Sequence, residues 1–156
     1  MKYSEVRADL FSLGSEYMFA HCISSDYAMG AGIAKRFTEI GVKDALFGEY
    51  GVPQISGDGH TDRWHSVGYC APVTVRNRIV FNLVTKERYW QKPTYATLTQ
   101  ALENMKQIIN EQHDISPVQI AMPKLGCGLD RLRWDSVRQI ILSVFDFDVE
   151  IKVAYI

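Results

Sequence analysis

Apolar residues gather in four short runs along the chain, three of which show little alternation with polar residues. A strand covered on both faces has such a near-continuous apolar sequence, as in a parallel sheet flanked by helices. The runs therefore predict strands over residues 16–23, 78–84, 118–122 and 149–156, the last of which alternates more. Weaker strand candidates are residues 2–11 and 66–73.

Between these runs, apolar residues recur at the spacing of one helix face. One such stripe follows Pro93-Thr94, a plausible helix start, and consists of Tyr95, Leu98, Leu102, Met105 and Ile109. A second stripe consists of Trp134, Val137, Ile141 and Val144. Residues 32–37 and 42–50 predict an earlier helix pair that is broken at Gly41. Strands interleaved with helices in this way predict an α/β sandwich.

The composition limits the class of protein. A chain of 156 residues fits one domain, and with 47% hydrophobic residues it can bury a core without a disulfide framework. The cysteines Cys22, Cys70 and Cys127 show no C-x-x-C spacing, which disfavours disulfides and a thiolate zinc site. No signal-peptide pattern opens the chain, and no apolar run approaches the roughly 20 residues of a membrane span. We therefore expect a protein of the cytoplasm, or of the nucleus or a host cytosol, with no membrane partner.

The charges are nearly balanced, with 17 basic and 18 acidic residues and a net charge of −1. The sequence contains no basic block, so nucleic acid is an unexpected partner. Nothing in it demands more than a monomer. A small anionic ligand held by backbone amides is compatible with this charge balance.

Each of the first three apolar runs is followed by polar or glycine-rich chain. Residues 24–26 and Gly30-Ala31-Gly32 follow the first, residues 85–88 the second, and residues 123–132 the third. Ligands of open α/β sheets collect beyond the carboxyl ends of the strands, so these segments form the expected site. Glycine allows close approach of the backbone, and a helix N-terminus favours anions, which suits a diphosphate. The spacing matches neither GxGxxG nor the P-loop, and the alternative is that the glycines only make turns.

Four segments occur in the order and spacing of a known family, namely RADLF, AHCISSDYAMGAGIAKRF, VTKERYWQKPTY and MPKLGCGLDRLRWDSV. With them the chain resembles the macrodomain superfamily, and within it the branch of terminal ADP-ribose protein glycohydrolases. The resemblance covers nearly the whole chain, is loosest over residues 51–70, and makes residues 1–156 a single macrodomain. It implies a three-layer α/β/α sandwich with a six-stranded mixed, largely parallel sheet. ADP-ribose would lie across the carboxyl edge of that sheet.

The resemblance also implies roles for individual residues. Asp9 would accept a hydrogen bond from the adenine amino group beside Leu10, and Ser24 would lie near the distal ribose. Two segments would bind phosphate and ribose mainly through backbone amides, and they comprise Gly30, Ala31, Gly32 and Ile33 and then Gly126, Cys127, Gly128 and Leu129. Lys86 and Asp130 match the catalytic lysine and the catalytic acid. Ile156 is a weaker match to the wall of the adenine site.

The chemistry of this pair fits removal of ADP-ribose from an acidic residue. The bond is an ester at the anomeric carbon, and its cleavage needs a group that handles a proton, as Asp130 can. A lysine amine can attack the aldehyde carbon of the opened sugar, an adduct that the resemblance implies for Lys86. We therefore expect an ADP-ribosyl hydrolase whose Lys86 and Asp130 form an ion pair in the empty enzyme. O-acetyl-ADP-ribose is a further expected substrate, and no cofactor or metal is expected.

Other functions stay open at the level of sequence. The chain could be a phosphatase of ADP-ribose 1″-phosphate, or a non-catalytic module that binds ADP-ribose. A non-catalytic binding module needs neither Lys86 nor Asp130, so the presence of both favours hydrolysis.

Each candidate residue also has a plainer interpretation. Lys86 could be a solvated lysine at a strand end, and Asp130 could cap the following helix. Cys127 could instead be a nucleophile if a helix N-terminus lowers the pKa of its thiol. His21, inside an apolar run, is expected to be hydrogen bonded in the core or at the edge of the site. A polar loop also carries four residues that superficially resemble metal ligands, Asp58, His60, Asp62 and His65.

Overall fold

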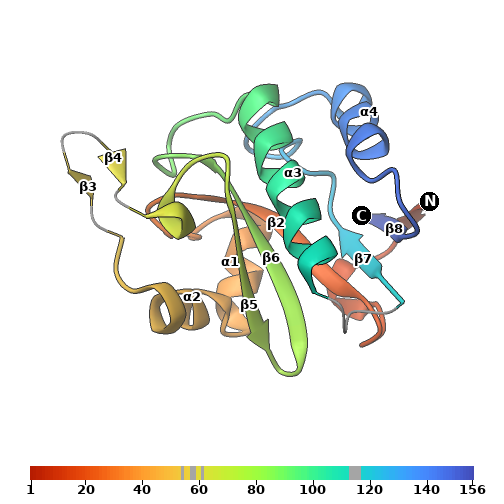
Figure 1. Ribbon diagram of the computed structural model, residues 1–156, viewed down its shortest axis with the longest axis horizontal. Coiled ribbons are helices and arrows are strands. Elements are labelled where there is room, and N and C mark those ends of the chain that lie inside the picture. Colours follow the sequence, from red (N-terminus) through yellow and green to blue (C-terminus); the bar gives the residue numbers. More distant parts are fainter. Residues whose placement is uncertain (54, 57–58, 61, 113–116) are drawn as a thin grey trace.

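The computed structural model describes residues 1–53, 55–56, 59–60, 62–112 and 117–156. Its centre is a six-stranded sheet in the order β1-β8-β7-β2-β6-β5 (Figure 1). Neighbouring strands pair in parallel, except that β5 runs antiparallel to β6 at one edge. The strands are β1 (Lys2–Arg7), β2 (Met18–Ser24), β5 (Cys70–Val75), β6 (Arg78–Lys86), β7 (Gln119–Met122) and β8 (Glu150–Tyr155). The predicted mixed, largely parallel sheet is confirmed.

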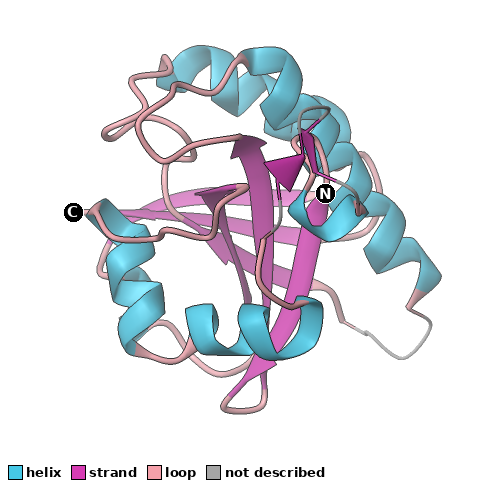
Figure 2. Ribbon diagram, turned by 90° about the vertical axis from the view of Figure 1, so that its left-hand side faces the viewer, coloured by secondary structure: helices cyan, strands magenta, loops and turns pink. Residues whose placement is uncertain are grey.

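Helices cover both faces of this sheet, which gives the three predicted layers (Figures 1 and 2). They are α1 (Gly32–Glu39), α2 (Val42–Tyr50), α3 (Tyr95–Glu111) and α4 (Trp134–Val144). Leu102 of α3 and Ile141 of α4 share one core with Phe81 of the sheet. Phe37 of α1 shares the core on the other face with Phe19. No helix in the described ranges has both the length and the apolar character needed to cross a membrane.

The local sequence determines where the helices begin. Thr94 precedes α3, and its hydroxyl accepts a hydrogen bond from the Thr97 amide at 3.0 Å as part of a capping box. Gly41 separates α1 from α2 with a φ of 105°, in the left-handed region that favours glycine. α4 begins at Trp134, and no side chain caps it. The interpretation of Asp130 as the cap of this helix is therefore wrong.

The segment between α2 and β5 contains a short hairpin and one turn of 3-10 helix. β3 (Ile55–Ser56) pairs antiparallel with β4 (Gly59–His60), and the turn η2 (Arg63–His65) follows. The carboxylate of Asp62 caps η2 and lies 2.7 Å from Nδ1 of His65. Asp58, one of the residues that resembled metal ligands, lies outside the described residues. Within those residues, no three acidic, histidine or cysteine side chains are grouped so that they could bind a metal.

His21 of β2 is fully buried in the core. Its Nε2 lies 2.6 Å from Oδ1 of Asn82, and because that oxygen can only accept, Nε2 carries the proton and donates it. The imidazole stacks on Phe37 with 3.8 Å between ring centroids. Its Nδ1 has no hydrogen-bond partner in the described structure, and burial lowers the pKa of His21 to about 4. The predicted hydrogen-bonded core role is confirmed.

Candidate active site

The carboxyl ends of the parallel strands lie along one edge of the sheet. The strands β1, β8, β7, β2 and β6 run in the same direction, so the segments that follow them emerge side by side. These strand ends and segments carry all of the predicted site residues, namely Asp9, Leu10, Ser24, Gly30, Ala31, Gly32, Ile33, Lys86, Gly126, Cys127, Gly128, Leu129, Asp130 and Ile156. The topology thus brings five stretches of chain to one place.

A β-bulge determines the position of Lys86. Strands β2 and β6 pair regularly as far as Ile23 opposite Val84, and then the register shifts so that Ser24 lies opposite Lys86. Thr85 is the extra residue of the bulge. Such an insertion re-aims the side chains that follow it. Lys86 therefore lies opposite Ser24 at the end of β6, in the position that Thr85 would occupy if the pairing stayed regular.

Lys86 and Asp130 meet at this edge although 44 positions separate them in the sequence. Nζ of Lys86 lies 2.6 Å from Oδ1 of Asp130, and the two side chains are only 14% and 15% exposed. The predicted ion pair is confirmed, and the interpretation of Lys86 as a solvated lysine is wrong. At this distance a proton can pass directly from the ammonium to the carboxylate.

The segment that carries Asp130 forms a short turn enclosed within a wider one. The Leu132 amide donates to the Gly126 carbonyl at 2.7 Å, and the Arg131 amide donates to the Gly128 carbonyl at 3.2 Å. Gly126 has a φ of 70°, and a Cβ there would lie 2.7 Å from Cδ1 of Leu132. The backbone conformation therefore favours glycine at this position, and any other residue would also displace the Leu132 side chain.

The two glycine segments differ in their relation to a helix. Ala31 is the N-cap of α1, so the first segment leads directly into a helix N-terminus, as predicted. The second segment does not, because α4 begins only at Trp134. Its Gly128 and Leu129 amides instead stand in a turn, where they donate to no group of the described chain. A Cβ at Gly32 would lie 3.6 Å from Cδ1 of Leu129, which shows that the two segments approach each other.

Cys127 is poorly suited to be a nucleophile. Its Sγ donates to the Leu125 carbonyl at 3.3 Å, and burial raises the pKa of its thiol. The helix N-terminus that would have lowered this pKa is absent from the segment. Burial also raises the pKa of the nearby Cys22 thiol to about 12, with a further contribution from the charge of Asp130. Neither thiol is thus readily deprotonated at neutral pH.

The predicted adenine acceptor, Asp9, is held by Arg36. The guanidinium donates to both carboxylate oxygens of Asp9, at 2.8 and 3.0 Å, and the Phe11 amide donates to Oδ1 at 3.0 Å. Arg36 also lies over the Phe11 ring, 4.3 Å from its centroid. These hydrogen bonds, with the one from Arg36 foremost, lower the pKa of Asp9. Arg36 was not among the predicted site residues. The one signal in the sequence was its place in AGIAKRF, just after the first glycine segment.

Asp26 lies in one of the segments expected at the site, but its sequence position indicated no individual role for it. Its Oδ1 accepts from the Ser24 hydroxyl at 2.5 Å and from the Ala28 amide at 3.1 Å. Its Oδ2 accepts from the Tyr89 amide at 3.1 Å. The carboxylate therefore joins the loop after β2 to the loop after β6, beside Lys86. Its position directly after a buried strand was the available signal.

Leu10 and Ile156 differ greatly in exposure. Leu10 belongs to the short 3-10 turn η1 (Leu10–Ser12), and its side chain is buried in the core, so only its backbone can meet a ligand. Ile156 follows β8 and is 87% exposed. The Ala8 amide donates to the Tyr155 carbonyl at 2.8 Å, which places both residues at the same corner of the sheet edge. Their roles stay predictions.

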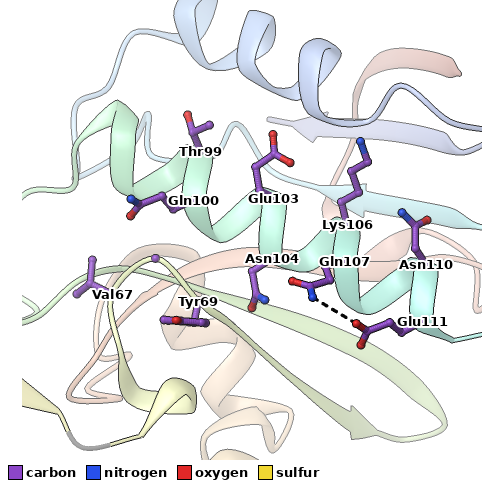
Figure 3. Close-up of a pocket in the computed structure, with 11 residues that line it drawn as sticks. Val67, Tyr69, Thr99, Gln100, Glu103, Asn104, Lys106, Gln107, Asn110 and Glu111 are labelled. Carbon is purple, nitrogen blue, oxygen red and sulfur yellow. Dashed lines mark hydrogen bonds between the residues drawn. The ribbon is translucent and has the colours of Figure 1, made fainter.

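Two hollows of the described surface lie away from these residues. One, of about 990 Å³, runs between α3 and residues 67–69 and is lined by polar side chains such as Gln100, Glu103 and Asn104 (Figure 3). The other, of about 560 Å³, lies beside β5 and α2. None of the predicted site residues lines either hollow. The convergence of strand ends, not the size of these hollows, therefore identifies the candidate site.

Comparisons with known proteins identify relatives of the whole chain. No protein-family profile matches the chain. The ADP-ribose glycohydrolase OARD1 of Homo sapiens is 38% identical over 151 residues, which span 95% of this chain and 88% of that protein, and OARD1 of Bos taurus has the same identity and coverage. The solved DarG macrodomains of Thermus aquaticus and Mycobacterium tuberculosis superpose with TM-scores of 0.76 and 0.77. Each is 20% identical, and the match covers 99% of this chain and 98% and 97% of theirs, so they show the fold alone.

Proposed function

Because this chain belongs to the macrodomain superfamily, as a member of the terminal ADP-ribose glycohydrolase type, we propose that it releases ADP-ribose from acidic side chains of proteins. The enzyme is an ADP-ribosyl hydrolase. O-acetyl-ADP-ribose carries an ester on the same sugar and is its second substrate. A relative named ADP-ribose glycohydrolase, 38% identical over most of the chain, supports this reaction class.

The observation that carries the proposal is the ion pair of Lys86 and Asp130 at 2.6 Å. A protein that only binds ADP-ribose has no need of a lysine and an aspartate paired at the carboxyl edge, because backbone amides suffice for a diphosphate. The pair lies beside two glycine segments whose amides suit phosphate. A nucleophile, a proton acceptor and an anion site are thus adjacent.

Lys86 must be neutral to act as a nucleophile, and Asp130 is close enough to accept the ammonium proton. The amine then attacks the anomeric carbon, a C–N bond forms, and the ester C–O bond breaks as the carboxylate of the acceptor protein leaves. The new ammonium group passes one of its two protons to water, which restores the nitrogen lone pair that the next step needs. Asp130 delivers its proton to the ring oxygen when the ribose opens and the adduct becomes a Schiff base. Water adds to the Schiff-base carbon and the C–N bond breaks. ADP-ribose is released and the free Lys86 amine is regenerated.

The remaining predicted residues position ADP-ribose for this attack. The first-turn amides of α1 and the amides of Gly128 and Leu129 bind the diphosphate. Asp9 binds the adenine amino group, with Leu10 and Ile156 at the same end of the site. Ser24, held by Asp26, lies on the side of Lys86 and faces the distal ribose.

Three substrates offered side by side test the proposal. They are a peptide ADP-ribosylated on glutamate, O-acetyl-ADP-ribose and ADP-ribose 1″-phosphate, with release of ADP-ribose measured for each. We expect turnover of both esters and a rate at least about 100-fold lower for the phosphate, which offers no carboxylate leaving group. Tight binding of ADP-ribose without turnover of any substrate would instead identify a binding module.

A second test concerns the ion pair between Arg36 and Asp9. Replacing Arg36 with Gln leaves Asp9 held by the Phe11 amide alone, so we expect ADP-ribose to bind roughly fivefold more weakly, as suits one exposed ion pair. Calorimetric titration with ADP-ribose measures this change. Arg138→Gln is the matched control, because Arg138 makes a comparable ion pair with Glu5, at 2.7 Å, within β1 and α4. An equal loss in both variants would contradict a role for Arg36 in adenine binding.

A further inference from the structure

Three large apolar side chains stand exposed on the two loops that flank the Lys86–Asp130 pair. Tyr89 and Trp90, on the loop after β6, are 65% and 66% exposed. Leu129, on the loop after β7, is 64% exposed and directly precedes Asp130. Exposed apolar side chains that lie singly on a surface need no explanation, but a group beside a reactive pair is typical of a docking surface.

Hydrogen bonds hold these loops in place. The Tyr89 amide is bound to Asp26, and the Gln91 side chain accepts from the Arg88 amide at 2.8 Å. Nζ of Lys92 donates to the Leu129 carbonyl at 2.6 Å and so joins the two loops. The aromatic rings are therefore presented from an ordered backbone, which reduces the entropy lost on binding a partner.

The two loops are also basic, although the chain as a whole has a net charge of −1. Residues 87–94 and 123–133 contain five cationic side chains, Arg88, Lys92, Lys124, Arg131 and Arg133. They contain two acidic side chains, and Asp130 is neutralised by Lys86, which leaves Glu87. A surface with this local surplus of positive charge favours an acidic partner.

We propose that Tyr89, Trp90, Lys92, Leu129 and Arg131 form an acceptor rim, which binds the polypeptide that carries ADP-ribose and favours acidic residues next to the modified one. This inference rests on the proposed function, since it extends the same site beyond the distal ribose. The ester places the acceptor polypeptide next to Lys86 and Asp130, where the rim lies. Aromatic and cationic side chains of this kind supply much of the affinity at protein interfaces.

Kinetics with two substrate classes test the acceptor rim. Peptides of equal length, ADP-ribosylated on one glutamate, carry either acidic or neutral flanking residues, and O-acetyl-ADP-ribose has no polypeptide at all. We expect the wild-type enzyme to favour the acidic peptide about tenfold in kcat/KM at low salt, and Trp90→Ala to raise KM for that peptide about tenfold. Trp90→Ala should leave kcat/KM for O-acetyl-ADP-ribose within about twofold, because that substrate does not reach the rim.

Tyr69→Ala is the matched control, since Tyr69 is an exposed aromatic residue that lies beside the hollow of Figure 3 and outside the rim. It should leave both substrates unaffected. If Trp90→Ala lowers kcat/KM equally for the peptide and for O-acetyl-ADP-ribose, the proposed acceptor rim is wrong, whereas the proposed hydrolase function still stands. No turnover of either substrate by the wild-type enzyme would refute the proposed function itself.

Exposed aromatic and basic residues can also bind single-stranded nucleic acid. Inhibition of the wild-type enzyme by a single-stranded oligonucleotide therefore belongs in the same experiment. An unmodified acidic peptide of equal charge is compared with the oligonucleotide. If the oligonucleotide inhibits more strongly, and Trp90→Ala abolishes that inhibition, the assignment of a polypeptide partner is overturned. Weaker or Trp90-independent inhibition supports it.

Discussion

Replacing Asp130 with Asn should lower kcat for glutamate-linked ADP-ribose by a factor of about 10²–10⁴, the range associated with loss of a general acid–base residue. The amide of Asn can still accept a hydrogen bond from Lys86 at the 2.6 Å position, but it cannot take the ammonium proton. Lys86 would then stay protonated and unable to attack. Single-turnover release of ADP-ribose from a modified peptide measures the loss.

Asp135→Asn provides the control for this substitution. Asp135 lies on the same stretch of chain, in the first turn of α4, and its side chain is 79% exposed. That variant should keep full activity. Calorimetry must also show that Asp130→Asn still binds ADP-ribose, because the loss predicted here is of catalysis. Activity of Asp130→Asn within threefold of the wild type would exclude the proton-transfer role.

The stability of the protein should fall by about 3 kcal/mol between pH 6.5 and pH 4 because of His21 alone. The folded-state pKa of His21 is about 4, below the usual value of 6.5 in an unfolded chain. Between these two values the unfolded chain binds a proton and the folded chain does not, so acid favours unfolding. The stabilising effect is thus complete above pH 6.5 and lost as the pH falls toward 4.

His21→Gln isolates this contribution from the carboxylates that also titrate in acid. Glutamine can still donate to Asn82 Oδ1 but does not titrate. The variant should therefore lose about 3 kcal/mol less stability than the wild type over the same pH range. Urea unfolding at a series of pH values measures both proteins, and only the slopes are compared, since the substitution also alters packing. Parallel slopes would show that His21 is not the group responsible.

The sequence predicted the fold well because the sheet is buried on both faces. The apolar runs near residues 16–23 and 78–84 coincide with β2 and β6, which lie inside the sheet and pack against helices on either side. The helix stripes near Leu102 and Ile141 were equally clear for the same reason. Such patterns are local, and a local pattern is enough to predict an element and its type.

The candidate site was predictable only in part. Glycine-rich segments and acidic residues at strand ends indicated where a ligand binds, because parallel strands bring their carboxyl ends together. The predicted helix begins at Trp134 as its apolar stripe indicates, but the chain makes two further turns between Gly126-Cys127-Gly128 and that helix. No residue type in LDRLRW distinguishes such turns from a helix start, because Asp130 is as suitable for capping as for an ion pair.

The sequence by itself therefore determined the layers, the direction of the strands and the edge at which the reactive residues gather. The tertiary structure alone decided which groups meet there. A register shift at Ser24 and Lys86, the 2.6 Å contact with Asp130 and the hold of Arg36 on Asp9 each join residues from separate elements. Hydrophobic periodicity records only whether a position faces the core, whereas an ion pair depends on distances between side chains far apart in the sequence.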